Sequence, residues 1–262
     1  MAKKKIIIAN WKMNLSLVES KRLVQEILTG LKAIFKEKKG QINFETVICP
    51  SFTDLVLISE ILQKNKEEIF LGAQNCFWKN QGNFTGEISP AYLKNLGCNY
   101  VIIGHSERKQ FLKEDGEMIN KKVKNALLSG LVPIICLGET KEERDRGLKE
   151  QAIINQISQF LEGVKINSGQ KIIISYEPVW VVNTGQTVNS EKVEYLAKII
   201  SQRMIDLFPL PIVRNNIRIV YGGNIDLNTI GSFINLENID GFLIGAASLK
   251  VEEFLKMGKL MS

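Results

Sequence analysis

The sequence has few of the residues from which zinc centres, disulfide scaffolds and membrane spans are built. Its 262 residues include one histidine and four cysteines, and no two cysteines form a CxxC pair. A zinc site would therefore lack ligands. No segment approaches the roughly 20 apolar residues of a membrane span, and the apolar run after the initial lysines is too short for a signal peptide. We expect no metal site and no membrane association.

Three of the four cysteines, Cys49, Cys98 and Cys136, lie in or beside apolar runs. We predict that these thiols are buried and reduced. Reduced thiols are typical of proteins in reducing compartments. The cysteine pattern therefore predicts a cytoplasmic protein.

The chain carries a net charge of +6 and has a pI of about 9.0, which could indicate a nucleic-acid partner or an anionic substrate. Its lysines are spread along the sequence, and the densest run, at residues 3–5, lies at the N-terminus. No basic patch is interleaved with aromatic residues. The charge therefore favours a solvated basic surface, and we expect no nucleic-acid partner.

Short apolar segments rich in β-branched residues recur along the chain. Most are continuous rather than alternating, as in strands that are buried on both faces. They lie at residues 6–9, 46–48, 70–73, 100–103, 132–135, 172–174, 217–220 and 242–244. Amphipathic helical patterns separate them. Ser16 and Thr140 each begin a capping box ahead of a long helical pattern, and Ser190 opens another helix.

Eight alternations of strand and helix predict an α/β fold with a parallel sheet. Eight parallel strands also suffice to close a (β/α)8 TIM barrel with outer helices. The alternative is an open doubly wound sheet, but no GxGxxG motif follows the first strand. No linker or change of composition divides the chain. We therefore predict a single barrel domain over residues 1–262.

Polar residues follow several of the predicted strands, at the barrel end that carries active sites. Asn10 and Lys12 are two residues apart and can project to one face; the alternative is a lysine that leaves the strand for solvent. His105 lies in the segment GHSER, which indicates a helical turn whose free amides favour a neutral imidazole. The alternative for His105 is a purely structural role.

The sixth predicted strand is followed by Glu177, which precedes Pro178 and the bulky residues Val179 and Trp180. Proline fixes the backbone here. Apolar neighbours partly desolvate a carboxylate, which suits it to act as a general base. The alternative is an ion-pair partner for a nearby lysine or arginine.

Small residues follow the last two predicted strands, in YGGN at residues 221–224 and GAAS at residues 245–248, where a helix opens. Such residues let backbone N–H groups approach a phosphate. Barrels frequently bind a phosphate between these two loops. Each signal alone is weak, but their order on strands 1, 4, 6, 7 and 8 favours one site.

Taken together, these segments resemble the triosephosphate isomerase family. NWKMN at residues 10–14, GHSER at 104–108, YEPVW at 176–180, YGGN at 221–224 and LIGAASL at 243–249 stand in the family's order and at its spacing. The resemblance covers nearly the whole chain. It implies interconversion of dihydroxyacetone phosphate and D-glyceraldehyde 3-phosphate through an enediol(ate), without a cofactor. This reaction belongs to glycolysis and gluconeogenesis.

The resemblance also implies roles for individual residues. Glu177 looks like the base that moves the proton, and His105 looks like the neutral donor to the enediol(ate) oxygens. Lys12 would supply fixed positive charge, and Asn10 would complete the donors. Glu107 and Ser106 look like supporting residues.

The family's phosphate contacts map onto residues that partly differ from its usual pattern. Asn183 and Asn224 stand where glycine and serine are common, and Ala246 follows Gly245 where a second glycine is usual. Gln186 replaces a lysine in the lid that follows Glu177. We expect these changes to affect phosphate affinity and lid kinetics rather than the class of reaction.

A long segment at residues 75–87 carries Phe77, Trp78 and Phe84 among glycines and asparagines. These aromatics are candidates for a contact between subunits; the alternative is a loop that folds back on its own barrel. In the family this loop docks into a second subunit. The resemblance therefore implies a homodimer in which Thr85 approaches the partner's active site.

Two other functions compete with isomerisation. A Schiff-base aldolase would use Lys12 as a nucleophile, which requires an apolar pocket and a neutral amine. A non-catalytic barrel would bind nucleic acid or a protein through its basic surface. Trapping of substrate with borohydride would indicate the first, and binding with a steep salt dependence would indicate the second.

Overall fold

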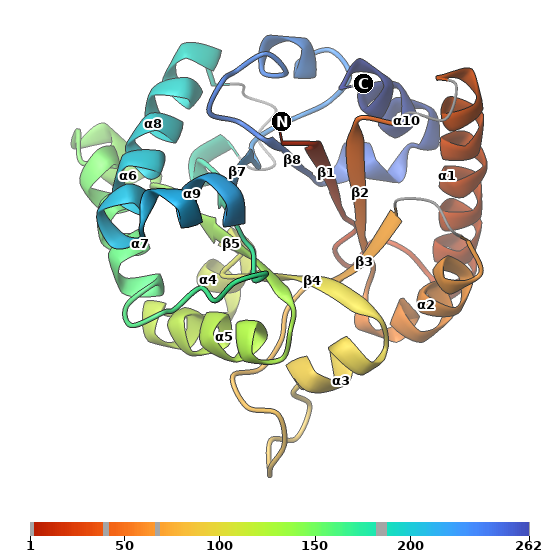
Figure 1. The fold of residues 1–262 in the computed structure, drawn as a ribbon, viewed down its shortest axis with the longest axis horizontal. Coiled ribbons are helices and arrows are strands. Elements are labelled where there is room, and N and C mark those ends of the chain that lie inside the picture. Colours follow the sequence, from red (N-terminus) through yellow and green to blue (C-terminus); the bar gives the residue numbers. More distant parts are fainter. Residues whose placement is uncertain (1–2, 39–41, 66–68, 182–187, 262) are drawn as a thin grey trace.

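The computed structural model describes residues 3–38, 42–65, 69–181 and 188–261. Within these residues eight strands all pair in parallel, each with the next, and β1 pairs with β8 to close the sheet (Figure 1). The predicted (β/α)8 barrel is confirmed, and the open sheet is excluded. The strands are β1 (Lys5–Asn10), β2 (Phe44–Cys49), β3 (Ile69–Ala73), β4 (Cys98–Ile103), β5 (Val132–Leu137), β6 (Ile172–Tyr176), β7 (Ile217–Tyr221) and β8 (Gly241–Ile244).

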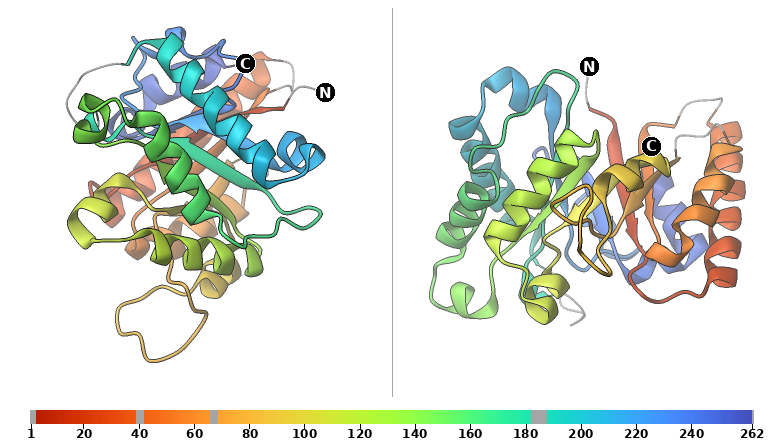
Figure 2. Two further views of the ribbon diagram at one scale, coloured as in Figure 1. Left: turned by 90° about the vertical axis from the view of Figure 1, so that its left-hand side faces the viewer. Right: turned by 90° about the horizontal axis from the view of Figure 1, so that it is seen from below.

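The helices surround the barrel and cover the outer face of its sheet (Figures 1 and 2). Short 3-10 turns lie in several of the connections, at η1 (Phe52–Asp54), η2 (Val179–Val181), η3 (Ile230–Ser232) and η4 (Ala246–Leu249). The α-helices are α1 (Leu17–Glu37), α2 (Leu55–Gln63), α3 (Pro90–Asn95), α4 (Ser106–Leu112), α5 (Gly116–Leu128), α6 (Lys141–Asp145), α7 (Lys149–Phe160), α8 (Ser190–Leu207), α9 (Leu210–Asn216) and α10 (Val251–Leu260). Among the described residues, no helix is long and apolar enough to cross a membrane.

The predicted capping box at Ser16 is confirmed at the start of α1, where the Ser16 hydroxyl and Glu19 carboxylate satisfy each other's backbone N–H groups. The box at Thr140 also forms, but the long helix predicted after it is wrong. Helix α6 has five residues and ends before Gly147, whose φ of +74° breaks the helix, and α7 then begins at Lys149.

The start of α8 differs slightly from the prediction at Ser190. Asn189 is the N-cap residue, and its Oδ1 accepts a hydrogen bond from the N–H of Glu191 at 2.7 Å. Ser190 is therefore the first helical residue. Asparagine fits because its short side chain reaches the free amides of the first turn.

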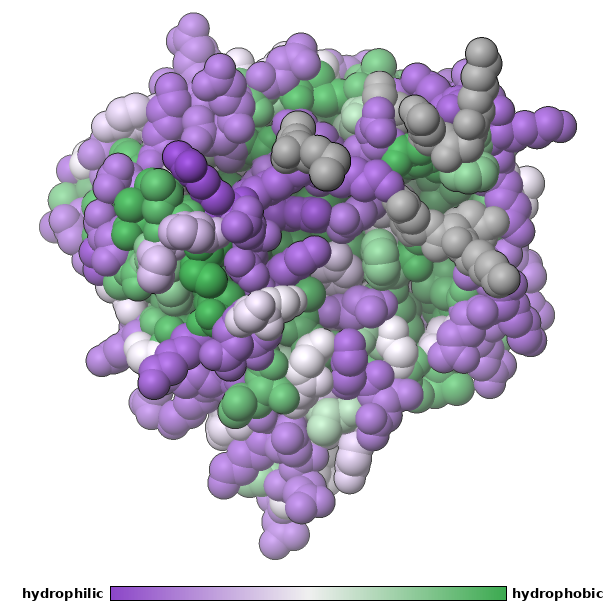
Figure 3. All heavy atoms as spheres, viewed as in Figure 1, coloured by the Kyte–Doolittle hydropathy of each residue, from purple (hydrophilic) through white to green (hydrophobic). Residues whose placement is uncertain are grey.

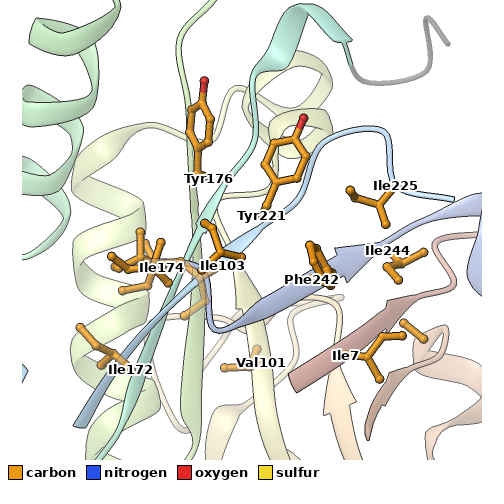
Figure 4. Packing of buried hydrophobic residues seen from close by; sticks show 14 of the residues in the cluster. Ile7, Val101, Ile103, Ile172, Ile174, Tyr176, Tyr221, Ile225, Phe242 and Ile244 are labelled. Carbon is orange, nitrogen blue, oxygen red and sulfur yellow. The ribbon is translucent and has the colours of Figure 1, made fainter. Parts of the chain in front are cut away.

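Side chains of each strand alternate between the interior of the barrel and the shell beneath the helices. On β6, Ile173 packs inside the barrel. Ile172, Ile174 and Tyr176 pack in the outer cluster (Figure 4). The interior core contains mainly aliphatic residues from all parts of the sheet. All four cysteines are buried free thiols, as predicted for three of them.

The segment at residues 75–87 projects away from the barrel between β3 and α3 (Figures 1 and 2). Its aromatic residues pack on one another: the Phe77 ring lies 4.0 Å from Trp78 and 4.6 Å from Phe84. Phe77 is buried within its own chain, so only half-buried Trp78 and Phe84 present aromatic surface outward. The outer face of the segment is mostly hydrophilic (Figure 3).

Candidate active site

A cavity of about 400 Å³ opens at the carboxyl ends of the strands. The cavity is lined by residues at or after the ends of β1, β4, β6, β7 and β8. These strands are far apart in the sequence. Parallel strands bring these ends together at one rim of the barrel. The predicted site residues that line the cavity are Asn10, Lys12, His105, Glu177, Asn224, Gly245 and Ala246.

Lys12 is held in an unusual backbone conformation immediately after β1. Its φ of +53° lies in the left-handed region, which residues with a side chain rarely adopt. Its backbone N–H donates to Oδ1 of Asn10 at 3.2 Å, and its Nζ donates to Oε1 of Glu107 at 2.6 Å. The alternative in which Lys12 leaves the strand for solvent is excluded. Glu107 contributes to the site through this ion pair.

His105 is the N-cap residue of α4, and its side chain is largely buried at the rim. The ring Nδ1 accepts a hydrogen bond from the N–H of Glu107 at 3.3 Å. In a neutral imidazole the proton is then on Nε2, which can donate. Nε2 lies 3.9 Å from Oε2 of Glu177. Ser106 is buried and does not line the cavity.

Glu177 follows β6 and has only 2% of its surface exposed. Its N–H donates to the carbonyl of Leu137 at 2.8 Å, which anchors the backbone. Oε1 accepts a hydrogen bond from the Ser175 hydroxyl at 3.3 Å, whereas buried Oε2 has no hydrogen-bond partner within the described chain. No described lysine or arginine pairs with Glu177, so the ion-pair alternative fails there. A buried carboxylate with one oxygen free of hydrogen bonds from the described residues is suited to accept a proton.

The glycines after β7 and β8 let the loop backbone lie close to the side chains of Glu177 and Lys12. A Cβ atom on Gly222 would lie 2.7 Å from Cγ of Glu177, and one on Gly245 would lie 3.8 Å from Nζ of Lys12. A phosphate at these loops would therefore lie beside the Lys12 ammonium. The helix predicted at residue 245 begins as the four-residue turn η4, and α10 follows it. Asn183 and Gln186 lie outside the described residues.

Sequence reasoning did not assign Ser175 or Lys109 to the site. Ser175 precedes Glu177 by two residues, so strand alternation alone places both side chains on one face. Lys109 lies behind Glu177, with Nζ 3.4 Å from the carbonyl of Cys136. Burial lowers the pKa of the Lys109 ammonium, and the Glu177 carboxylate partly offsets this effect. Its sequence position in α4 carried no comparable signal.

A sequence model of triosephosphate isomerase matches residues 5–261. The chain belongs to the triosephosphate isomerase family. The triosephosphate isomerase of Dictyoglomus thermophilum is 43% identical over 257 residues, which cover 98% of this chain and 99% of that protein. That of Dictyoglomus turgidum is 43% identical over 253 residues, with 96% and 97% covered. That of Clostridium tetani is 38% identical over 252 residues, with 96% and 94% covered.

Proposed function

We propose that this barrel interconverts dihydroxyacetone phosphate and D-glyceraldehyde 3-phosphate through an enediol(ate), with Glu177 as the base. One observation carries the assignment of the base. The bare Oε2 of Glu177 lies 3.9 Å from Nε2 of His105, in the cavity that also contains Lys12. Membership of the triosephosphate isomerase family supports the reaction.

Each polar group has a distinct task in this proposal. Glu177 removes a proton from one carbon of the triose and returns it to the neighbouring carbon. His105, neutral and protonated on Nε2, donates to the oxygen on which negative charge develops. Lys12 stabilises that charge and the phosphate, and Asn10 adds a donor beside it. Fixed donors aimed at developing charge lower the barrier because they need no reorganisation during the reaction.

The phosphate is proposed to bind between the loops after β7 and β8. Asn224, Gly245 and Ala246 line the cavity there, and Gly245 lies against the Lys12 side chain. Asn183 would contribute from the segment after Glu177. The reaction proposed needs no metal or organic cofactor. Among the described residues, no three histidine, cysteine, aspartate or glutamate side chains converge as metal ligands.

The contacts of Lys12 argue against a Schiff-base aldolase. A lysine nucleophile must be a neutral amine in an apolar pocket. Nζ of Lys12 instead donates to the Glu107 carboxylate at 2.6 Å. Such a contact favours the charged ammonium, which serves as a fixed cation.

We further propose that the protein is a homodimer built on the projecting segment at residues 75–87. Thr85 is exposed on this segment, and Met13, beside Lys12, has 94% of its surface exposed. At the root of the segment, Gln74 donates to the Lys12 carbonyl at 2.8 Å. The projecting segment is therefore connected to the backbone of Lys12 at the rim of the cavity. The mass of the protein in solution tests this proposal.

We also propose that the chain forms one catalytic domain and that the protein is cytoplasmic. One catalytic domain over residues 1–262 agrees with the span of the family match. Four buried free thiols suit the reducing environment of the cytoplasm.

Replacement of Glu177 tests the proposed function directly. Glu177→Gln keeps the shape of the side chain and removes the base, so we expect turnover of D-glyceraldehyde 3-phosphate to fall on the order of 10²–10⁴-fold. An assay coupled to consumption of dihydroxyacetone phosphate measures this rate. Near wild-type turnover by the variant would refute the assignment.

A further inference from the structure

Ser175 places a hydroxyl among the mainly apolar residues of the barrel interior. It is fully buried on β6 and shares the inward face of that strand with Ile173. A buried hydroxyl needs a hydrogen-bond partner to offset its lost hydration. Its Oγ donates to Oε1 of Glu177 at 3.3 Å. The hydroxyl is therefore directed at the carboxylate rather than into the apolar core.

The surroundings leave this pair of side chains in direct contact. A Cβ atom on Gly222 would lie 2.7 Å from both the Ser175 Oγ and the Glu177 Cγ, so only a glycine leaves room at that position. Cys136 is the register partner of Ser175 on β5. Burial and then the Glu177 carboxylate raise the pKa of the Cys136 thiol, which stays protonated and neutral. The Cys136 thiol therefore lies near the carboxylate as a neutral group.

The two oxygens of Glu177 consequently differ. Oε1 receives the Ser175 hydrogen bond, whereas buried Oε2 has no partner among the described residues and faces Nε2 of His105 at 3.9 Å. A carboxylate free to rotate would present either oxygen to the substrate. One anchored oxygen reduces that freedom before the substrate binds.

We propose that Ser175 is a positioning residue for the base: by holding Oε1 it directs the bare Oε2 of Glu177 toward the substrate. The inference rests on the proposed role of Glu177. It adds a residue that does not touch the substrate and acts only through the carboxylate.

Ser175→Ala removes the hydroxyl without adding bulk. We expect kcat to fall about tenfold, the worth of a hydrogen bond to a charged group. The inhibition constant of inorganic phosphate should stay unchanged, because Ser175 does not line the cavity beside the phosphate loops. The acidic limb of the kcat/KM profile should move to higher pH, since the hydroxyl stabilises the ionised carboxylate. His105, Lys109 and Cys136, the other titratable groups around Glu177, are unchanged in this variant.

Two further variants make the test specific. Ser175→Cys keeps a weak donor, and we expect it to recover part of the lost kcat. Ser20→Ala is the matched control, because Ser20 is a buried serine whose hydroxyl donates to Oδ2 of Asp54 at 2.6 Å outside the cavity. It should lower thermal stability and leave kcat and its pH profile unchanged.

The outcomes separate this inference from the proposed function. Unchanged kcat and pH profile in Ser175→Ala, with Glu177→Gln inactive, would overturn the inference and leave the function intact. A fall in kcat without movement of the acidic limb would show a merely structural role and would also overturn it. An active Glu177→Gln variant would remove the basis of both.

Discussion

Replacing Lys122 should expose the energetic importance of a buried charge cluster beneath the His105 strand end. Nζ of Lys122 donates to Oε2 of Glu114 at 2.7 Å, and both side chains are almost fully buried. Glu114 also accepts hydrogen bonds from Nε of Arg108 at 2.7 Å and from the N–H of Gly104 at 3.1 Å. The cluster thus supports the backbone immediately before His105. Lys122→Met keeps the length of the side chain and removes its charge.

The contacts set the size of the expected effect. Removing one partner of a buried ion pair costs about 3–5 kcal/mol when the other charge is left uncompensated. Arg108 and the Gly104 N–H still compensate Glu114, so we expect about 2–3 kcal/mol. For a chain of this size, that loss lowers Tm by about 5–10 °C. Thermal unfolding at a fixed protein concentration measures the shift.

The adjacent residue provides a matched control. Lys121 lies on the same helix and pairs with Glu117, but both side chains are well exposed. Exposed pairs contribute little because water screens them, so Lys121→Met should shift Tm by less than about 2 °C. Equal shifts in the two variants, or no loss of Tm in Lys122→Met, would refute the reasoning.

The pH dependence of the shift provides a second check. Burial alone would raise the pKa of Glu114, but the charges of Lys122 and Arg108 outweigh burial and lower it. A carboxyl whose pKa is lower in the folded state stabilises the fold above its unfolded value, and this stability is lost as pH falls through the folded value. The Tm difference between wild type and Lys122→Met should be full at pH 7. It should shrink as pH falls below the ordinary glutamate range and through the lowered pKa of Glu114, where the folded-state carboxylate becomes protonated.

Two other predictions concern the proposed site and the assembly. His105→Gln should lower kcat about 10²–10⁴-fold with little change in the affinity for inorganic phosphate, because the ring acts on the reacting oxygens; steady-state kinetics with phosphate as a competitive inhibitor checks this, and unchanged kcat would contradict it. The protein should sediment at twice the chain mass of 29.6 kDa at micromolar concentration. A monomer under those conditions would rule out the proposed dimer.

Much of the fold follows from local sequence signals. Apolar runs that do not alternate mark strands covered on both faces, and their number predicted the closed barrel. The break between α6 and α7 was missed because Gly147 ends a helix only when it adopts positive φ, which the pattern alone does not reveal. The sequence pattern also did not reveal how the aromatic residues of the segment at residues 75–87 pack. Their type indicated a contact, but only the structure shows that Phe77 packs on its own loop.

The candidate site was predictable to the extent that strand ends converge in a barrel. Topology alone brings Lys12, His105 and Glu177 to one rim. The contact between Lys12 and Glu107 was not predictable, because these residues are 95 positions apart and no pattern fixes such a pairing. Ser175 is a different case: its spacing from Glu177 was visible, but a serine in a strand carries no sign that its hydroxyl meets the base.

The most direct test of the proposed chemistry compares three proteins in one coupled assay of D-glyceraldehyde 3-phosphate isomerisation. They are the wild type, Glu177→Gln and the control Glu45→Gln. Glu45 is a half-buried carboxylate at the amino end of β2; it pairs with Arg218, and neither residue lines the cavity. We expect Glu177→Gln to lose turnover on the order of 10²–10⁴-fold, while folded Glu45→Gln retains it. Turnover by Glu177→Gln close to that of the wild type would contradict the role of Glu177 as the base.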